Sequence, residues 1–270
     1  MFAKLLKHEF RTSKSILGLL SLIALGVSVL ATAATKLLVC NIQNLDKASE
    51  SALAVAAPVL GFSVLGLVVY VGATFFLLLA QFYKSKFTDE GYLTFTLPTG
   101  SHMIYLASVV NILIWHLIAG VVVFCGVMMV LLFGTSPDHV VNTELFTAWR
   151  ENMEYLFSIL RVRFDWVETL SGLTRGLISA ISGVVLTTTC ITIGAAAAKK
   201  HKILAAVGIY YGLSLLISIV SSAFLAANSA VILAGQLDYT GTVSTLLNLA
   251  IAVGGYFLTT WLMKKRINLP

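Results

Sequence analysis

The chain has 270 residues, of which 58% are hydrophobic and 11% charged, and its formal net charge is +6. Soluble domains carry about 25% charged residues, so this composition excludes a soluble globular protein, and the low charge also excludes a disordered chain. The apolar residues form long unbroken runs, unlike the roughly ten-residue alternating segments of an outer-membrane barrel. The sequence therefore predicts an all-α membrane protein.

Six apolar gaps between charged residues are each long enough for a helix to cross the roughly 30 Å hydrocarbon core of a bilayer. We predict six transmembrane helices, at residues 15–37, 55–81, 103–133, 176–198, 203–226 and 243–263. An even number of spans places both termini on one side, and the loops on that side hold twelve of the 18 Lys and Arg residues. The positive-inside rule then predicts a multi-pass protein of the cell (plasma) membrane with both termini cytoplasmic. The excess of bases follows from this topology and from anionic lipids, and does not indicate nucleic-acid binding.

The first 14 residues have the pattern of an amphipathic helix that lies in the membrane interface. At about 100° per residue, the apolar residues fall on one arc and the basic residues on the opposite arc. The apolar arc consists of Phe2, Leu5, Leu6 and Phe10, and the basic arc of Lys4, Lys7, His8, Arg11 and Lys14. We expect the apolar arc to lie in the acyl boundary of the inner leaflet, with the bases among anionic headgroups, before the chain turns into the first span.

Glu9 breaks this pattern because it falls on the apolar side. It indicates either a partner at that place, such as a protein subunit, or a carboxylate that extends to the headgroups or pairs with Lys14 or Arg11. A different interpretation of the whole segment is a secretory signal peptide with residues 31–33 as the cleavage box. The long basic region and the long apolar stretch after it favour a first span instead.

The inner loop between the second and third spans, residues 82–102, is more apolar than a linker would be. Its aromatic and aliphatic side chains are Phe82, Tyr83, Phe87, Tyr92, Leu93, Phe95 and Leu97. A short helix with an apolar knob and a charged rim suits a groove on a soluble partner. Packing of the loop against the membrane is the alternative.

The run from Thr88 to Pro98, TDEGYLTFTLP, resembles the segment after the second span in permease subunits of ABC-2-type exporters, where Glu-Gly, a later Leu and a Leu-Pro pair precede the third span. The basic amphipathic opening, the six spans and the basic tail at residues 264–266 are similar as well. One departure is Ser108, because the family often has a Lys early in the third span. The resemblance implies that residues 1–270 form a single ABC-2-type transmembrane domain.

By this resemblance, residues 1–14 would be the elbow helix, and a cytoplasmic coupling helix in residues 82–102 would enter a cleft on an ATPase. Glu90 would be its charged contact, and Phe87 or Leu93 its apolar knob. The residues assigned to ATPase coupling are Lys86, Phe87, Asp89, Glu90, Gly91, Tyr92 and Leu93. The family also implies three kinds of partner: two ABC ATPase subunits, a second copy of this chain, and membrane lipids. The inner turn at residues 199–202 would be a smaller second contact.

The outer segment between the third and fourth spans, residues 135–174, contains the pattern of an amphipathic helix. Apolar residues three or four positions apart define one face. They are Leu145, Trp149, Met153, Leu156, Leu160, Phe164, Val167 and Leu170. We expect an extracellular helix that lies on the outer leaflet or packs on the bundle, with a lid over the outer mouth as the alternative.

A few polar residues lie inside the predicted spans. His116 lies roughly 20 Å into the third span, where an ionisable residue is a candidate for handling substrate or protons, although a hydrogen bond to a neighbouring helix is the more frequent role. In the fifth span, serines recur every four residues, a spacing that allows close helix approach. The candidates for contacts along a pathway or between two copies are Asn111, His116, Ser214, Ser218 and Ser222.

The sequence contains no motif for chemistry of its own. There is no GxxxxGK[ST] loop, so ATP and Mg would bind a separate ATPase and this chain would bind no cofactor. Cys40, Cys125 and Cys190 lack CxxC spacing, so no metal site or disulfide framework is indicated. No Ser-His-Asp set, carboxylate pair or HExxH motif converges on one site, so we predict no catalytic residues and no enzyme. No Asp, Glu, Lys or Arg lies in the middle of a predicted span, which argues against ion coupling.

These patterns lead to one hypothesis with two alternatives. The hypothesis is the permease subunit of an ATP-driven ABC-2-type exporter, which forms with a second copy the pathway for an amphiphilic or hydrophobic cargo such as a lipid, drug or peptide. The first alternative is a membrane scaffold or sensor that docks a soluble ATPase without transport. The second is an ion-coupled secondary carrier.

Overall fold

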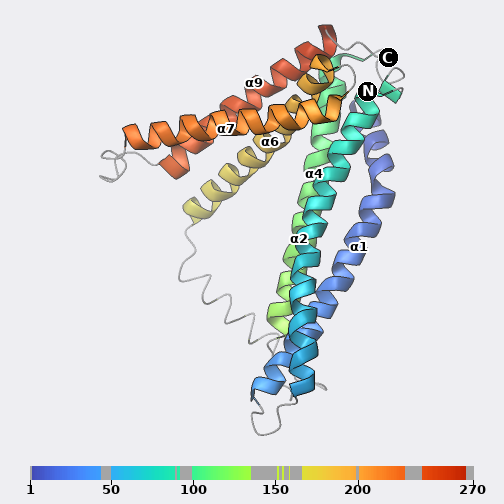
Figure 1. Cartoon of the computed structure of the whole chain (residues 1–270), viewed down its shortest axis with the longest axis vertical. Helices are drawn as coiled ribbons and strands as arrows, with labels where there is room; N and C mark the ends of the chain where they lie inside the picture. Colours follow the sequence, from blue (N-terminus) through green and yellow to red (C-terminus); the bar gives the residue numbers. More distant parts are fainter. Residues whose placement is uncertain are drawn as a thin grey trace. The chain divides into compact units, whose positions relative to one another are not determined.

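A computed structural model describes residues 2–43, 50–88, 90–91, 99–134, 151, 154, 158, 166–198, 201–228 and 239–265. All regular elements within these ranges are helical (Figure 1). In chain order they are α1 (Phe2–Gln43), α2 (Glu50–Phe87), α4 (Ser101–Met129), the π-helical turn η2 (Val130–Gly134), α6 (Trp166–Ala197), α7 (Lys202–Ala227), the π-helical turn η3 (Tyr239–Val243) and α9 (Ser244–Lys265).

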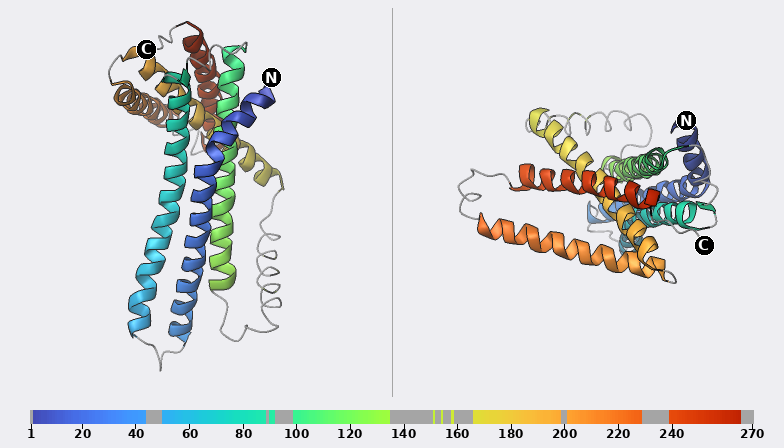
Figure 2. Two further views of the ribbon diagram at one scale, coloured as in Figure 1. Left: turned by 90° about the vertical axis from the view of Figure 1, so that its right-hand side faces the viewer. Right: turned by 90° about the horizontal axis from the view of Figure 1, so that it is seen from above.

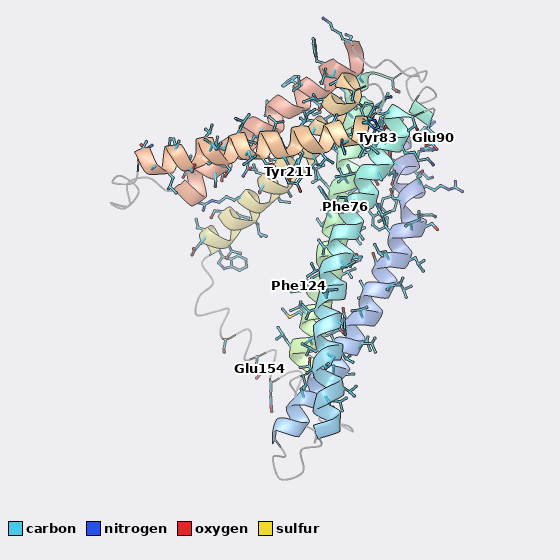
Figure 3. The ribbon with its side chains drawn as sticks, viewed as in Figure 1. Phe76, Tyr83, Glu90, Phe124, Glu154 and Tyr211 are labelled. Atoms are coloured by element: carbon cyan, nitrogen blue, oxygen red, sulfur yellow. The ribbon has the colours of Figure 1, made fainter. Side chains whose placement is uncertain are left out.

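Six of these helical stretches are long and apolar enough to cross a membrane, which confirms the predicted number of spans. They are Phe2–Leu38, Ala54–Phe87, Ser101–Gly134, Trp166–Ala197, Lys202–Ala227 and Gly241–Lys265. Their surfaces carry large apolar side chains that the described part of the chain does not cover, such as Phe76 and Phe124 (Figure 3). Apolar surface of this extent needs a lipid environment, so the chain is a multi-pass membrane protein.

The opening segment and the first span are one helix. The sequence predicted a turn after Lys14, but α1 continues from Phe2 to Gln43 without a break. The physical reason is local: no Pro interrupts this stretch and its first Gly is Gly18, so nothing stops the helical hydrogen bonding.

The fourth span begins earlier than predicted, at Trp166 instead of residue 176. Val167 and Leu170, from the apolar face predicted for the outer segment, are therefore exposed residues of the first turns of α6. The remaining residues of that face, from Leu145 to Phe164, lie outside the described residues. The orientation of the outer helix stays a prediction.

The chain divides into two compact units. Unit 2 comprises Arg11–Leu77 and Ile114–Asp165, and unit 1 comprises Met1–Phe10, Leu78–Leu113 and Trp166–Pro270. Helices α1, α2 and α4 each contribute to both units.

In unit 2, the long parts of α1, α2 and α4 run side by side (Figures 1 and 2). Ala24, Tyr70 and Ala119 form the buried centre, and the Tyr70 hydroxyl lies 2.9 Å from that of Ser21. Gly126 of α4 lies so close to Ser28 of α1 that a Cβ at this glycine would overlap the serine hydroxyl. Small residues at such contacts allow helix backbones to approach closely, which is the usual way that helices associate in a membrane.

In unit 1, α6 packs against both α7 and α9, and Figure 2 shows α6 passing beneath α9 and ending beside the start of α7. Two glycines mark the contacts. A Cβ on Gly194 would lie 2.6 Å from the backbone nitrogen of Ala206 on α7, and one on Gly255 of α9 would lie 2.7 Å from Val185 Cγ1 on α6. Gly194 and Gly255 therefore permit backbone approaches that a larger residue would prevent.

Candidate functional site at the end of α2

Helix α2 extends six residues beyond the predicted second span and ends at Phe87. Lys84 and Lys86 lie in its last turn, where basic residues interact favourably with the helix dipole. After Phe87 the chain bends at Thr88, whose carbonyl accepts a hydrogen bond of 2.8 Å from the Gly91 amide. The connection to α4 thus starts from a fixed helix end.

A buried ion pair connects this helix end to the opening segment. Lys86 Nζ lies 2.7 Å from Glu9 Oε1, and the two side chains are only 3% and 11% exposed. The Ser108 hydroxyl of α4 donates to the same carboxylate oxygen at 3.0 Å, and Gln81 Nε2 of α2 donates to the Glu9 main-chain carbonyl at 3.2 Å. Glu9 is therefore held by groups from α2 and α4 together.

This geometry gives Glu9 a partner that neither sequence interpretation named. The carboxylate pairs with a base of the same chain that lies 77 residues away, not with a neighbouring base of its own helix. It also gives Ser108 a role, because its hydroxyl donates to Glu9. Sequence analysis missed the pair because it ended the second span at residue 81 and so treated Lys86 as part of a loop.

Burial on the opening segment follows the two predicted arcs. Phe2, Leu5, Leu6 and Phe10 are half-buried and Glu9 is buried, whereas the basic residues Lys4, Lys7, His8, Arg11 and Lys14 are exposed. The apolar arc therefore faces the protein at least in part, and the basic arc is exposed.

Aromatic side chains pack against one another at the end of α2. Phe82 and Phe87 are buried with ring centroids 5.9 Å apart, Phe82 also lies 6.2 Å from Tyr105 of α4, and Tyr83 lies 6.0 Å from Phe87. Phe82 and Lys86 are four residues apart and share the inner face of α2. This seat fixes the end of α2 against α4.

Two residues assigned to ATPase coupling are buried in this structure. Lys86 and Phe87 are 2% and 4% exposed, and both make contacts within this chain. The expectation that Phe87 or Leu93 is the apolar knob of a coupling helix stays a prediction. Gly91 is buried as well.

Glu90 is the exposed member among the described coupling residues. Its carboxylate lies 3.0 Å from Lys84 Nζ, with the two side chains 56% and 69% exposed. Figure 3 shows Glu90 and Tyr83 together at this end of α2. The other three coupling residues, Asp89, Tyr92 and Leu93, lie outside the described residues.

A second polar cluster joins α4, α6 and α9, and sequence analysis did not identify it. The Tyr105 hydroxyl lies 2.8 Å from Thr188 Oγ1, and Thr189 Oγ1 lies 2.8 Å from Thr259 Oγ1. Thr189 also donates to the Gly255 carbonyl at 3.2 Å. These hydroxyls are buried and hydrogen-bonded across helices, which stabilises helix association in a membrane. The signal in the sequence was the threonine run 187–189 inside an apolar span.

Of the predicted pathway residues, Asn111 and the three serines of α7 belong to unit 1, and His116 belongs to unit 2. Asn111 is buried in α4, and His116 is half-buried with its ring 5.4 Å from that of Phe75 in an edge-on contact. Ser218 and Ser222 are exposed on α7, and Ser214 and Ser222 donate to carbonyls of their own helix. Within the described residues no three His, Cys, Asp or Glu side chains are grouped as a metal site.

Comparison with known proteins gives no match, since the chain is similar to no family model, no curated protein and no solved structure.

Proposed function

We propose that this chain is the permease subunit of an ABC-2-type exporter. Two copies would form the pathway for an amphiphilic or hydrophobic cargo, and two separate ATPase subunits would dock at the loop between α2 and α4. The observation that carries the proposal is an exposed Glu90 on a short turn that starts directly from an immobilised helix end. A loop that receives force needs both an accessible contact and a stiff base.

The stiff base is the buried pair of Glu9 and Lys86 with the aromatic seat around Phe82. Movement of the docked loop would be passed to α2 and α4 as rigid elements, and the bundle would open alternately to the two sides. In this proposal the loop, both termini and the basic arc of the opening segment are cytoplasmic, in agreement with the distribution of Lys and Arg.

The proposal also needs a surface for the second copy or for the cargo pathway. The exposed serine face of α7, with Ser218 and Ser222, is our candidate contact with the second copy or the pathway. The resemblance between the segment from Thr88 to Pro98 and the ABC-2 permeases is the other support for the proposal.

An ion-coupled carrier is the second candidate, and the same ion pair favours it. Ionisable residues that are buried in membrane-spanning helices often belong to proton or ion pathways, and Glu9 and Lys86 lie in two candidate spans. The carrier predicts transport that continues without ATP and stops when the ion gradient is dissipated. A scaffold that docks an ATPase predicts no transport in either condition.

Native mass spectrometry tests the proposal directly. The tagged chain is purified in a mild detergent from the membrane of its own host. We expect a complex of two copies of this chain with two copies of a protein that contains a Walker A loop. A bare monomer or homodimer, under conditions that keep other transporter complexes intact, would contradict the proposal.

A further inference from the structure

We propose that Glu9 is a positioning residue that latches the opening segment to the ends of α2 and α4, and thereby sets where the loop after α2 starts. The latch consists of Glu9, Lys86 and Ser108. It is a conformational device, separate from any docking contact, and it does not depend on the identity of the transported cargo or of a partner.

Groups from α2 and α4 converge on Glu9 of α1. One carboxylate oxygen of Glu9 receives both the Lys86 ammonium at 2.7 Å and the Ser108 hydroxyl at 3.0 Å, while Gln81 holds the Glu9 main chain. Three elements that are distant in the sequence therefore meet at one side chain. A displacement of any one element breaks or lengthens a hydrogen bond made by the others.

The charged groups of Glu9 and Lys86 are both buried. Both charges are almost fully removed from solvent, and a buried charge that loses its partner is strongly unfavourable. The pair therefore strongly favours one arrangement of the opening segment over any arrangement that separates Glu9 from Lys86.

Lys86 lies next to the point where the chain leaves α2. Lys86 is the penultimate residue of α2, and the bend at Thr88 follows directly after Phe87. The start of the loop therefore moves with Lys86. By contrast, the exposed pair of Lys84 and Glu90 at the same helix end is solvated, so it does not impose a comparable constraint.

The test is a distance measurement between spin labels at two exposed alanines of unit 1, using the variants Ala3→Cys and Ala80→Cys. The native cysteines are replaced by Ala, and the full chain is reconstituted in lipid nanodiscs. The latch predicts a single narrow distance distribution for the parent protein. Glu9→Gln and Lys86→Met should each broaden or shift it, and the exchanged double variant Glu9→Lys with Lys86→Glu should restore it.

Lys84→Met is the matched control, because it removes a lysine two residues away that is exposed. It should leave the distance distribution unchanged. Restoration by the charge exchange is the readout that a purely space-filling role would not give. If Glu9→Gln fails to fold, Ser108→Ala replaces it, since that variant loses one hydrogen bond to the carboxylate and should produce a smaller broadening.

Three results would overturn the latch. They are an unchanged distribution in folded Glu9→Gln, an equal effect of Lys84→Met and Lys86→Met, and no restoration by the charge exchange. None of these measurements requires an ATPase, so failure of the latch and failure of the proposed transport function are separate outcomes.

Discussion

Lys86 and Glu9 form a salt bridge of 2.7 Å across 77 residues of sequence, and Ser108 donates to the same carboxylate oxygen. This contact joins the first helix to the end of the second and the start of the next. It lies just before the bend at Thr88, where the chain leaves α2.

The buried pair predicts an asymmetry between single and double substitutions. Lys86→Met leaves the Glu9 carboxylate buried without its counter-charge and should cost about 3–5 kcal/mol of unfolding free energy. Glu9→Met combined with Lys86→Met removes both charges and should recover most of that loss. Unfolding of the detergent-solubilised protein by denaturant titration measures both, and a double variant as unstable as the sum of the singles would contradict the prediction.

The exposed pair at the same helix end should behave differently. Because both side chains are more than half exposed, Glu90→Gln should change the unfolding free energy by at most about 1 kcal/mol.

If Glu90 contacts an ATPase, Glu90→Lys should abolish cargo-stimulated ATP hydrolysis in the purified complex without lowering the melting temperature. Leu93→Asp is expected to do the same in the docking loop. Full stimulated activity in both variants would count against a docking role for this loop.

The contact between α6 and α7 depends on Gly194. In Gly194→Ala the new Cβ would lie 2.6 Å from the Ala206 backbone, so the helices must separate, at a cost of about 1–3 kcal/mol. Gly208→Ala on α7 is the matched control, because within the described residues no atom outside its own helix backbone lies within 4 Å of its Cβ position. The control should be neutral or stabilise by up to about 1 kcal/mol. Thermal unfolding is followed by a thiol-reactive dye on the buried Cys190, with Cys40 and Cys125 replaced by Ala, and equal melting temperatures would contradict the close approach.

The cluster of hydroxyl groups that joins α4, α6 and α9 should contribute modestly to the unfolding free energy. Tyr105→Phe removes the hydroxyl that bonds to Thr188, and interhelical hydrogen bonds in membranes contribute about 0.6 kcal/mol on average and about 1.7 at most. Thr188 keeps a bond of 2.8 Å to the Val184 carbonyl, which limits the loss. Tyr211→Phe, on the exposed side of α7, is the control and should have no effect on unfolding free energy. A loss for Tyr105→Phe no larger than for the control would show that the cluster is not stabilising.

The helices and their number could be predicted from the sequence because the requirement is local. A segment that crosses a bilayer must satisfy its own backbone hydrogen bonds and present an apolar surface, so the length of each apolar run is sufficient to identify it. The amphipathic opening was equally readable, since 100° per residue separates its basic and apolar arcs. The same pattern identified Glu9 as an exception on the apolar arc, but it did not identify Lys86 as its partner.

Only the tertiary structure decided which residues meet. The pairing of Glu9 with Lys86, the inward turn of Phe87 and the contact of Tyr105 with Thr188 join segments that lie far apart or depend on where a helix ends. An apolar run indicates that a helix can cross the membrane but not which of its faces meets a neighbour. Because α2 extends past residue 81, Lys86 is a buried helical residue and not the loop residue that the sequence predicted. The free energy of burying that charge is offset only by a partner, Glu9, that the fold brings from the first turns of α1.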